Sequence, residues 1–117
     1  MNIEEYREYC LSKRGVTEDF PFDNVTLVFK VAGKMFALAD IEGFTSVNLK
    51  CDPERAIELR ETYSAVQPGY HMSKKHWNTV SIEGDVPDAL FFELIDHSYD
   101  LVVASLTKKM RDELQAG

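Results

Sequence analysis

The residue types best suited to binding or catalysis gather in one segment, residues 67–80, with the sequence QPGYHMSKKHWNTV. This segment holds two of the three histidines, the only tryptophan and a pair of adjacent lysines. No Asp or Glu occurs between Glu61 and Glu83, although the whole chain carries a formal net charge of -7. Basic side chains attract phosphates, and aromatic rings stack on bases at about 1–3 kcal/mol per base. The pattern therefore favours a binding surface without identifying its ligand.

The predicted contacts of this surface are side chains of the segment itself and two lysines on or beside the expected strands. They are Tyr70, His71, Lys74, Lys75, His76, Trp77, Lys34 and Lys50. A structural interpretation stands beside this one. Trp77 would pack beneath a helix on the other side of the sheet, and His76 would hydrogen-bond to the backbone. The residue pattern alone leaves both interpretations open.

Nucleophilic catalysis, metal binding and nucleotide binding each require patterns that this sequence lacks. Cys10 and Cys51 have no CxxC spacing and are expected to be reduced thiols. His71 and His76 are five residues apart, which matches neither HExxH nor alternate strand positions, and His97 is expected to be a packed helical residue. No glycines form a phosphate loop. We therefore predict no catalytic residues, metal or cofactor; an enzyme would need a histidine near Cys51 or a carboxylate pair in a cleft.

Composition indicates one ordinary domain. The 117 residues are 44% apolar and 28% charged, values typical of a single globular unit, residues 1–117. No run approaches the ~18 apolar residues of a membrane span, and the N-terminus is acidic rather than signal-like, so we expect a cytoplasmic protein. A pI near 4.9 argues against tight nonspecific DNA binding, since phosphate contacts supply most of that affinity.

The first half of the chain predicts a helix followed by three strands. Residues 2–13 have helical spacing, and residues 16–24 are expected to form a loop that Phe20 and Phe22 pin to the core. Strands are predicted over 26–31, 35–39 and 44–50, with short turns between them. Short turns imply an antiparallel meander.

The second half predicts helices around one more strand. Asp52 and Pro53 are typical of a helix start, and residues 77–82 alternate as a strand does. A long helix is expected over roughly 87–105, followed by a short helix capped by Thr107. The predicted fold class is α+β, with an antiparallel sheet of four to six strands packed against helices.

Several separate motifs give the chain a family resemblance. Segments 66–80 (VQPGYHMSKKHWNTV) and 94–102 (LIDHSYDLV) resemble the MmcQ/YjbR family, as do residues 28–31 with 34–37, and segment 49–53. The resemblance implies a CyaY-like (frataxin-like) fold and DNA binding through a double-wing arrangement of β elements, and it supplies no catalytic residue. The positions that match the family signature are Pro68, His71, Lys74, His76 and Trp77.

Two functional hypotheses follow, both of them non-enzymatic. The first is a small cytoplasmic module that binds DNA weakly and in a salt-dependent way through residues 67–80. The second is a module that binds a small molecule or a protein partner in the same groove. No membrane partner is expected, and the oligomeric state stays open.

Overall fold

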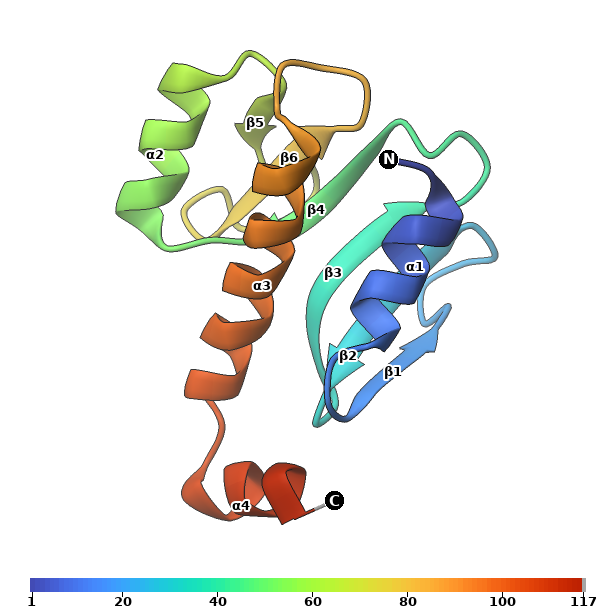
Figure 1. Ribbon diagram of the computed structural model, residues 1–117, viewed down its shortest axis with the longest axis vertical. Coiled ribbons are helices and arrows are strands. Elements are labelled where there is room, and N and C mark those ends of the chain that lie inside the picture. The colour runs from blue at the N-terminus through green and yellow to red at the C-terminus, as the bar shows by residue number, and fades with distance from the viewer. Residues whose placement is uncertain (117) are drawn as a thin grey trace.

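Antiparallel pairing joins six strands into one sheet in the order β1-β2-β3-β4-β6-β5. The computed structural model describes residues 1–116 (Figure 1). Its elements are α1 (Ile3–Leu11), β1 (Val16–Asp19), β2 (Thr26–Val31), β3 (Lys34–Asp40), β4 (Ser46–Lys50), α2 (Pro53–Thr62), β5 (Val66–Pro68), β6 (Trp77–Ser81), α3 (Asp88–Ala104) and α4 (Lys108–Ala116). The expected α+β class, an antiparallel sheet of four to six strands packed against helices, is confirmed.

The predicted meander is confirmed as β2, β3 and β4, which pair in sequence order. Two short edge strands extend it beyond the prediction. The expected loop over 16–24 is wrong for its first residues, because β1 pairs with β2 over Val16 to Asp19. At the other edge, β5 pairs with β6 where only a turn was expected. Both edge strands are too short for their alternation to stand out in the sequence.

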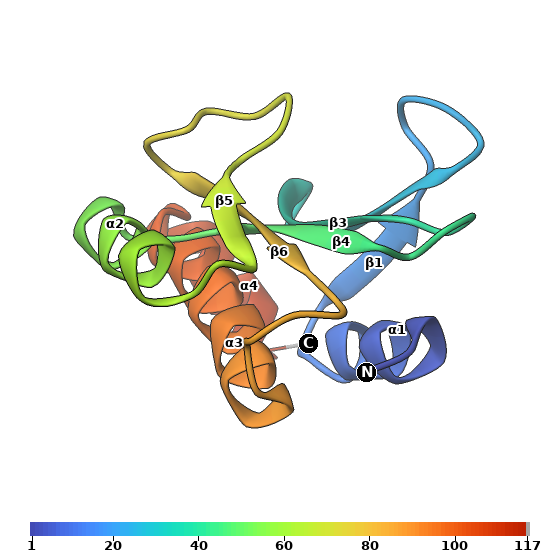
Figure 2. The same ribbon diagram turned by 90° about the horizontal axis from the view of Figure 1, so that it is seen from above.

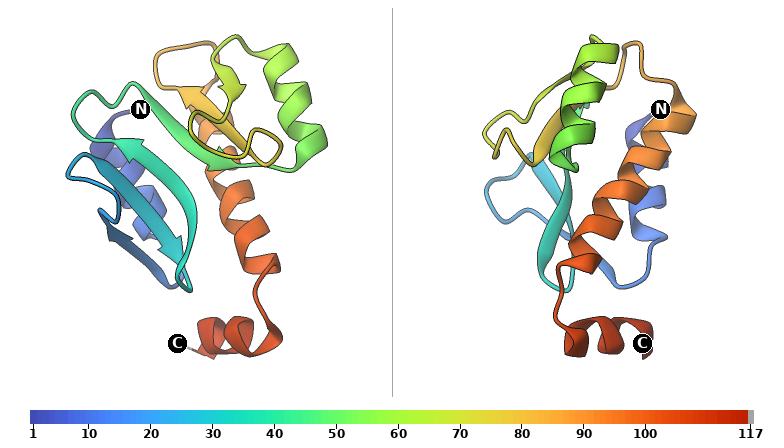
Figure 3. Two further views of the ribbon diagram at one scale, coloured as in Figure 1. Left: turned by 180° about the vertical axis from the view of Figure 1, so that it is seen from behind. Right: turned by 90° about the vertical axis from the view of Figure 1, so that its left-hand side faces the viewer.

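All helices lie on one face of the sheet (Figure 2). Seen from behind, the sheet lies in front of α1 and α3 (left panel of Figure 3). The main core fills this interface, and its largest side chains, Tyr6, Phe29, Phe36, Phe91 and Ile95, are at most 1% exposed. The opposite face is covered by no helix within residues 1–116, and two loops rise above it (Figure 2).

Local signals start the later helices where the sequence predicts. The Asp52 side chain accepts a hydrogen bond from the Arg55 backbone N–H, and Pro53 occupies the first position of α2. Thr107 Oγ1 accepts from the Met110 backbone N–H at 3.2 Å and so caps α4. No helix within residues 1–116 is long and apolar enough to cross a bilayer.

Ser98 of α3 ties the helix layer to the sheet. The β3–β4 ladder ends at the pair Ala37 and Leu49, so the strands have no mutual partners beyond it. There the fully buried Ser98 hydroxyl donates to the Phe36 carbonyl at 2.5 Å and accepts from the Lys50 N–H at 2.9 Å. A single side chain thus satisfies two main-chain groups that the ladder leaves unpaired.

Candidate functional site

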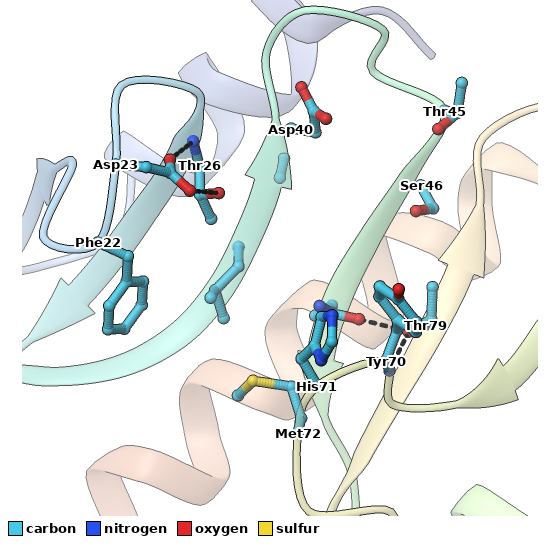
Figure 4. Close-up of a pocket in the computed structure, with 13 residues that line it drawn as sticks. Phe22, Asp23, Thr26, Asp40, Thr45, Ser46, Tyr70, His71, Met72 and Thr79 are labelled. Atoms are coloured by element: carbon cyan, nitrogen blue, oxygen red, sulfur yellow. Dashed lines mark hydrogen bonds between the residues drawn. The ribbon is translucent and has the colours of Figure 1, made fainter.

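A cavity of about 590 Å³ lies on the helix-free face of the sheet (Figure 4). Its walls are the 20–25 loop, between β1 and β2, and the 69–76 loop, between β5 and β6. The lining residues come from these loops and from the strands between them. They are Phe22, Asp23, Thr26, Leu38, Ala39, Asp40, Thr45, Ser46, Asn48, Tyr70, His71, Met72 and Thr79. Its volume falls within the range of about 300–1,000 Å³ that is typical of small-molecule sites.

Strand register places the floor residues of this cavity in one row. Leu38 on β3 lies opposite Asn48 on β4, and Asn48 lies opposite Thr79 on β6. Val28 on β2 continues the row beyond Leu38. Because side chains alternate between faces, all four point away from the helices. Val28 is buried beneath the cavity, and the floor passes from the apolar Leu38 on β3 to the polar Asn48 and Thr79 on β4 and β6.

Trp77 supports the site from below. It packs with Val28 and Leu38 in a second, smaller core on the helix-free face, where Met35 and Met72 cover it. It points away from the main core, as its strand phase predicts, but no helix within residues 1–116 covers it, so the structural interpretation is wrong on that point. Only 8% of Trp77 is exposed, and so its ring is not an open stacking surface.

The 69–76 loop begins with a glycine because the backbone of Gly69 packs directly against Trp77. A Cβ atom on Gly69 would lie 2.7 Å from Trp77 Cβ, closer than real contacts allow. The Gly69 N–H also donates to the Trp77 carbonyl at 2.9 Å. One residue on, the Tyr70 N–H donates to Thr79 Oγ1 at 2.9 Å, and the Thr79 hydroxyl in turn donates to Asn48 Oδ1. The loop is thereby tied to the cavity floor.

Arg60 of α2 ties the other end of the same loop. Its Nε donates to Asn78 Oδ1 at 2.7 Å, and its terminal nitrogen donates to the carbonyls of Lys74 and Trp77, the latter at 3.2 Å. Asn78 is only 2% exposed, and its side-chain amide faces the carbonyl of Ala56. One guanidinium thus links a helix, a buried amide and the wall of the cavity.

The 20–25 loop contributes an ordered carboxylate and an exposed ring. Asp23 accepts hydrogen bonds from the backbone N–H groups of Val25 and Thr26, and these bonds lower the pKa of its carboxyl. Asp23 is therefore held ionised. The prediction that Phe20 and Phe22 pin this loop to the core is wrong. They are 44% and 63% exposed, since the loop rises on the face opposite the core.

Apart from the buried Trp77, the predicted binding residues of the 67–80 segment divide into two groups. Tyr70 and His71 line the cavity, and their ring centroids lie 4.0 Å apart. Lys74, Lys75 and His76 are exposed but do not line the cavity. His71 has a left-handed backbone conformation, with φ of 59°, and this sharp turn separates the two groups.

Hydrogen bonds to or from the backbone hold Lys74 and His76 of the second group in place. The Lys74 ammonium turns back to the carbonyl of Gly69 at 3.2 Å. The His76 carbonyl accepts from the Cys51 N–H at 2.8 Å, which joins the loop end to the start of α2. This bond comes from the His76 main chain. Among the described residues the exposed His76 imidazole makes no hydrogen bond to the backbone, so the structural interpretation is wrong on that point too.

The two supporting lysines lie away from the cavity. Lys34 is exposed at the start of β3, and Lys50 is half-buried at the end of β4, directly opposite Trp77. The charged side chains that do line the cavity are Asp23 and Asp40. The cavity is therefore acidic, although the 67–80 segment that supplies part of its wall is basic.

The thiols and the third histidine lie outside the cavity. Burial raises the pKa of Cys10 to about 12 and that of Cys51 to about 11, so neither is a thiolate at neutral pH. His97 Nε2 accepts from the Asp52 N–H at 3.1 Å, and burial lowers its pKa. Within residues 1–116, no three His, Cys, Asp or Glu side chains converge as a metal site would require.

Most of the lining residues were missed by the sequence prediction, although two signals could have indicated them. Polar residues occupy the non-core phase of predicted strands, as Ser46 and Asn48 do on β4 and Thr79 does on β6. The run Phe20-Pro21-Phe22 places two aromatic rings beside a proline in a loop, where a ligand contact is as plausible as a core contact. Neither signal says which residues share one cavity.

Comparison with known proteins confirms the resemblance. The family model described as YjbR matches residues 11–101. YjbR of Escherichia coli strain K12 is 36% identical over 112 residues, which cover 95% of this chain and 95% of that protein. YbdF of Escherichia coli O157:H7 is 37% identical over 99 residues, covering 84% of this chain and 81% of YbdF.

Solved structures share the fold. The crystal structure of DR2400 from Deinococcus radiodurans superimposes with a TM-score of 0.92 at 43% identity, covering 97% of this chain and 88% of that one. A Pseudomonas syringae protein superimposes with a TM-score of 0.72 at 28% identity, covering 86% and 98%. On the extent of the family match and of these similarities, the chain belongs to the YjbR family.

Proposed function

We propose that this protein is a cytoplasmic, non-enzymatic binding module whose ligand is a small molecule held between the 20–25 and 69–76 loops. The observation that carries the proposal is the cavity of about 590 Å³ on a sheet face that the helices leave uncovered. Such concave, partly apolar cavities are the usual form of small-molecule sites. The free thiols Cys10 and Cys51 suit the reducing cytoplasm.

Exposed apolar side chains concentrate beside this cavity. Phe22 and Tyr70 line it and are 63% and 67% exposed. Phe20 precedes the first of them in the same loop, and Ile41 directly follows a lining residue of β3; they are 44% and 39% exposed. Clustered exposed apolar surface marks interaction sites in soluble proteins. Ile57, 53% exposed on α2, is the remaining large example within residues 1–116.

The chemistry of the lining favours a small organic ligand over the phosphate backbone of DNA inside the cavity. Asp23 and Asp40 both contribute carboxylates to it, and no Lys or Arg among the described residues lines it. Phosphates bind where positive charge gathers, and two carboxylates repel them. The aromatic and apolar lining suits a ligand with a hydrophobic body.

The test is a titration with three naphthalene probes that differ only in their charged or polar group: 2-naphthylmethylammonium, 2-naphthylmethanol and 2-naphthoate. A probe of this size, at about 0.3 kcal/mol per non-hydrogen atom, is expected to bind with a Kd of about 1 mM. Chemical shifts in ¹H–¹⁵N spectra should move for the amides of Thr26, Tyr70 and Thr79. The chemical shifts of amides in α1 and α3, on the other side of the sheet, should not change.

Variants of the exposed rings check that the probes occupy the cavity. Phe22→Ala and Tyr70→Ala are each expected to weaken binding about fivefold, since each removes a wall, with stability changed by only about 0.5 kcal/mol. Ile57→Ala is the matched control, because it removes an exposed apolar side chain elsewhere, and should leave binding unchanged. The proposal fails when no probe shifts the cavity amides at about 10 mM, or when Ile57→Ala weakens binding as much.

A second candidate is weak DNA binding outside the cavity, as the family resemblance implies. The observation that favours it is that Lys34 and Lys75 are exposed and, within residues 1–116, form no salt bridge with an acid. A double variant, Lys34→Glu with Lys75→Glu, should then abolish binding of a duplex oligonucleotide at low salt, while Phe22→Ala should not affect it. Absence of binding by the unaltered protein at about 100 μM oligonucleotide would eliminate this candidate, since nonspecific binders reach about 10⁻⁴–10⁻⁶ M.

A further inference from the structure

Two carboxylates share one end of the cavity. Asp40 on β3 lies directly opposite Thr26 on β2 in the strand register. Thr26 in turn donates its N–H and its hydroxyl to the carboxylate of Asp23, at 2.7 and 3.1 Å. Figure 4 shows Asp23, Thr26 and Asp40 toward this end, with Phe22 beside Asp23 and with Tyr70 and His71 across the cavity. The negative charge is therefore localised.

No side chain within residues 1–116 neutralises this charge. Neither Asp23 nor Asp40 forms a salt bridge with any other described residue. One oxygen of Asp40 accepts from the Glu42 N–H at 2.8 Å, and its other oxygen has no hydrogen-bond donor among the described residues. Two like charges at one end of a cavity repel each other, and a cation between them relieves that repulsion.

The rest of the lining suits a hydrophobic body attached to that cation. Phe22 stands on one side of the cavity, and Tyr70 with His71 stands on the other (Figure 4). Aromatic faces attract cations through their quadrupoles, and they pack against planar apolar groups. The side chains of Leu38 and Met72 complete an apolar path between the rings. A metal ion such as Ca²⁺ would need about six to eight oxygen ligands and would make no contact with these rings.

We infer that the ligand of this cavity is an organic cation, an ammonium or amidinium group carried on an aromatic or apolar body. The cationic group lies against Asp23 and Asp40, and the body lies over Leu38 between Phe22 and Tyr70. This inference rests on the proposed small-molecule function and adds the chemical class of the ligand.

The relative affinities of the three naphthalene probes test the inference. The ammonium probe is expected to bind about fivefold to tenfold more tightly than the alcohol, and the carboxylate most weakly. Equal affinities, or tighter binding of the carboxylate, would overturn the cationic assignment while the small-molecule function stands. Failure of all three probes to shift the cavity amides would overturn both.

The variant Asp40→Asn tests the contribution of the negative charge, because it removes the charge and keeps the size of the side chain. Asparagine keeps an oxygen that accepts from the Glu42 N–H, so the strand end should be preserved. We expect about a fivefold loss of affinity for the ammonium probe and no change for the alcohol. Asp100→Asn makes the same chemical change at an exposed position of α3 and is the matched control. Equal effects of the two variants, or equal effects of Asp40→Asn on both probes, would contradict the inference.

Discussion

Replacing Arg60 with alanine is expected to lower the free energy of unfolding by about 2–3 kcal/mol and the Tm by about 10 °C. The reason is that one guanidinium serves the buried amide of Asn78 and the carbonyls of Lys74 and Trp77. Its loss leaves the Asn78 oxygen buried without that partner, which costs more than an exposed hydrogen bond is worth. Thermal and denaturant unfolding measure the effect.

The same variant should loosen the wall of the cavity. Amide hydrogen exchange of the 69–76 loop should accelerate, and affinity for a naphthalene probe should fall, because the loop loses its tie to α2. Arg60→Lys should recover only part of the stability, since one ammonium cannot reproduce the planar fork. Arg7→Ala is the control: it removes an exposed ion pair with Glu18, at 51% side-chain exposure for the arginine, and should cost at most about 1 kcal/mol. If Arg60→Ala lowers the free energy of unfolding by no more than Arg7→Ala does, the hydrogen bonds of Arg60 are unimportant for stability.

Replacing Ser98 with alanine is expected to cost about 2–4 kcal/mol, the largest effect of a single-oxygen deletion that we anticipate for this chain. The hydroxyl is fully buried and serves both the Phe36 carbonyl and the Lys50 N–H. Alanine leaves both main-chain groups without that partner but removes almost no volume, so the cost reports the hydrogen bonds rather than a cavity.

Two measurements separate this explanation from a general loosening of the helix. Hydrogen exchange of the Lys50 amide should accelerate more than that of neighbouring β4 amides. Ser12→Ala, which removes an exposed hydroxyl that donates to the Tyr9 carbonyl at 2.6 Å, should change stability by only about 0.5 kcal/mol. Similar costs for both serines would mean that the junction between β3, β4 and α3 does not depend on Ser98.

The parts of the fold that were predictable depend on local signals. Asp52 and Pro53 begin α2 because a cap and a preset φ act within one turn of the chain. Ser98 lies at helical spacing among the buried apolar residues of α3, so this local pattern alone indicates that it faces the core. β1 and β5 escaped prediction because their pairing depends on longer strands elsewhere.

The candidate site was only partly predictable for a related reason. Tyr70 and His71 came from the conspicuous 67–80 segment and do line the cavity. Asp23 and Asp40 were overlooked, because nothing local to either residue shows that the other lies in the same cavity. The lysines of the segment were expected to gather on one binding surface, whereas the turn at His71 separates Lys74 and Lys75 from the cavity.

The sequence by itself determined the class of the fold, the order of its main elements, the family and one stretch of the site. The fold class and the order of elements depend on caps, alternation and helical spacing, which act over a few residues. The family and the stretch of the site depend on short motifs of contiguous residues. Only the tertiary structure decided that Phe22 faces outward, that Trp77 is covered and that the cavity is acidic. Those properties arise where β2, β3, β4 and two loops distant in the chain meet on the face that the helices leave open.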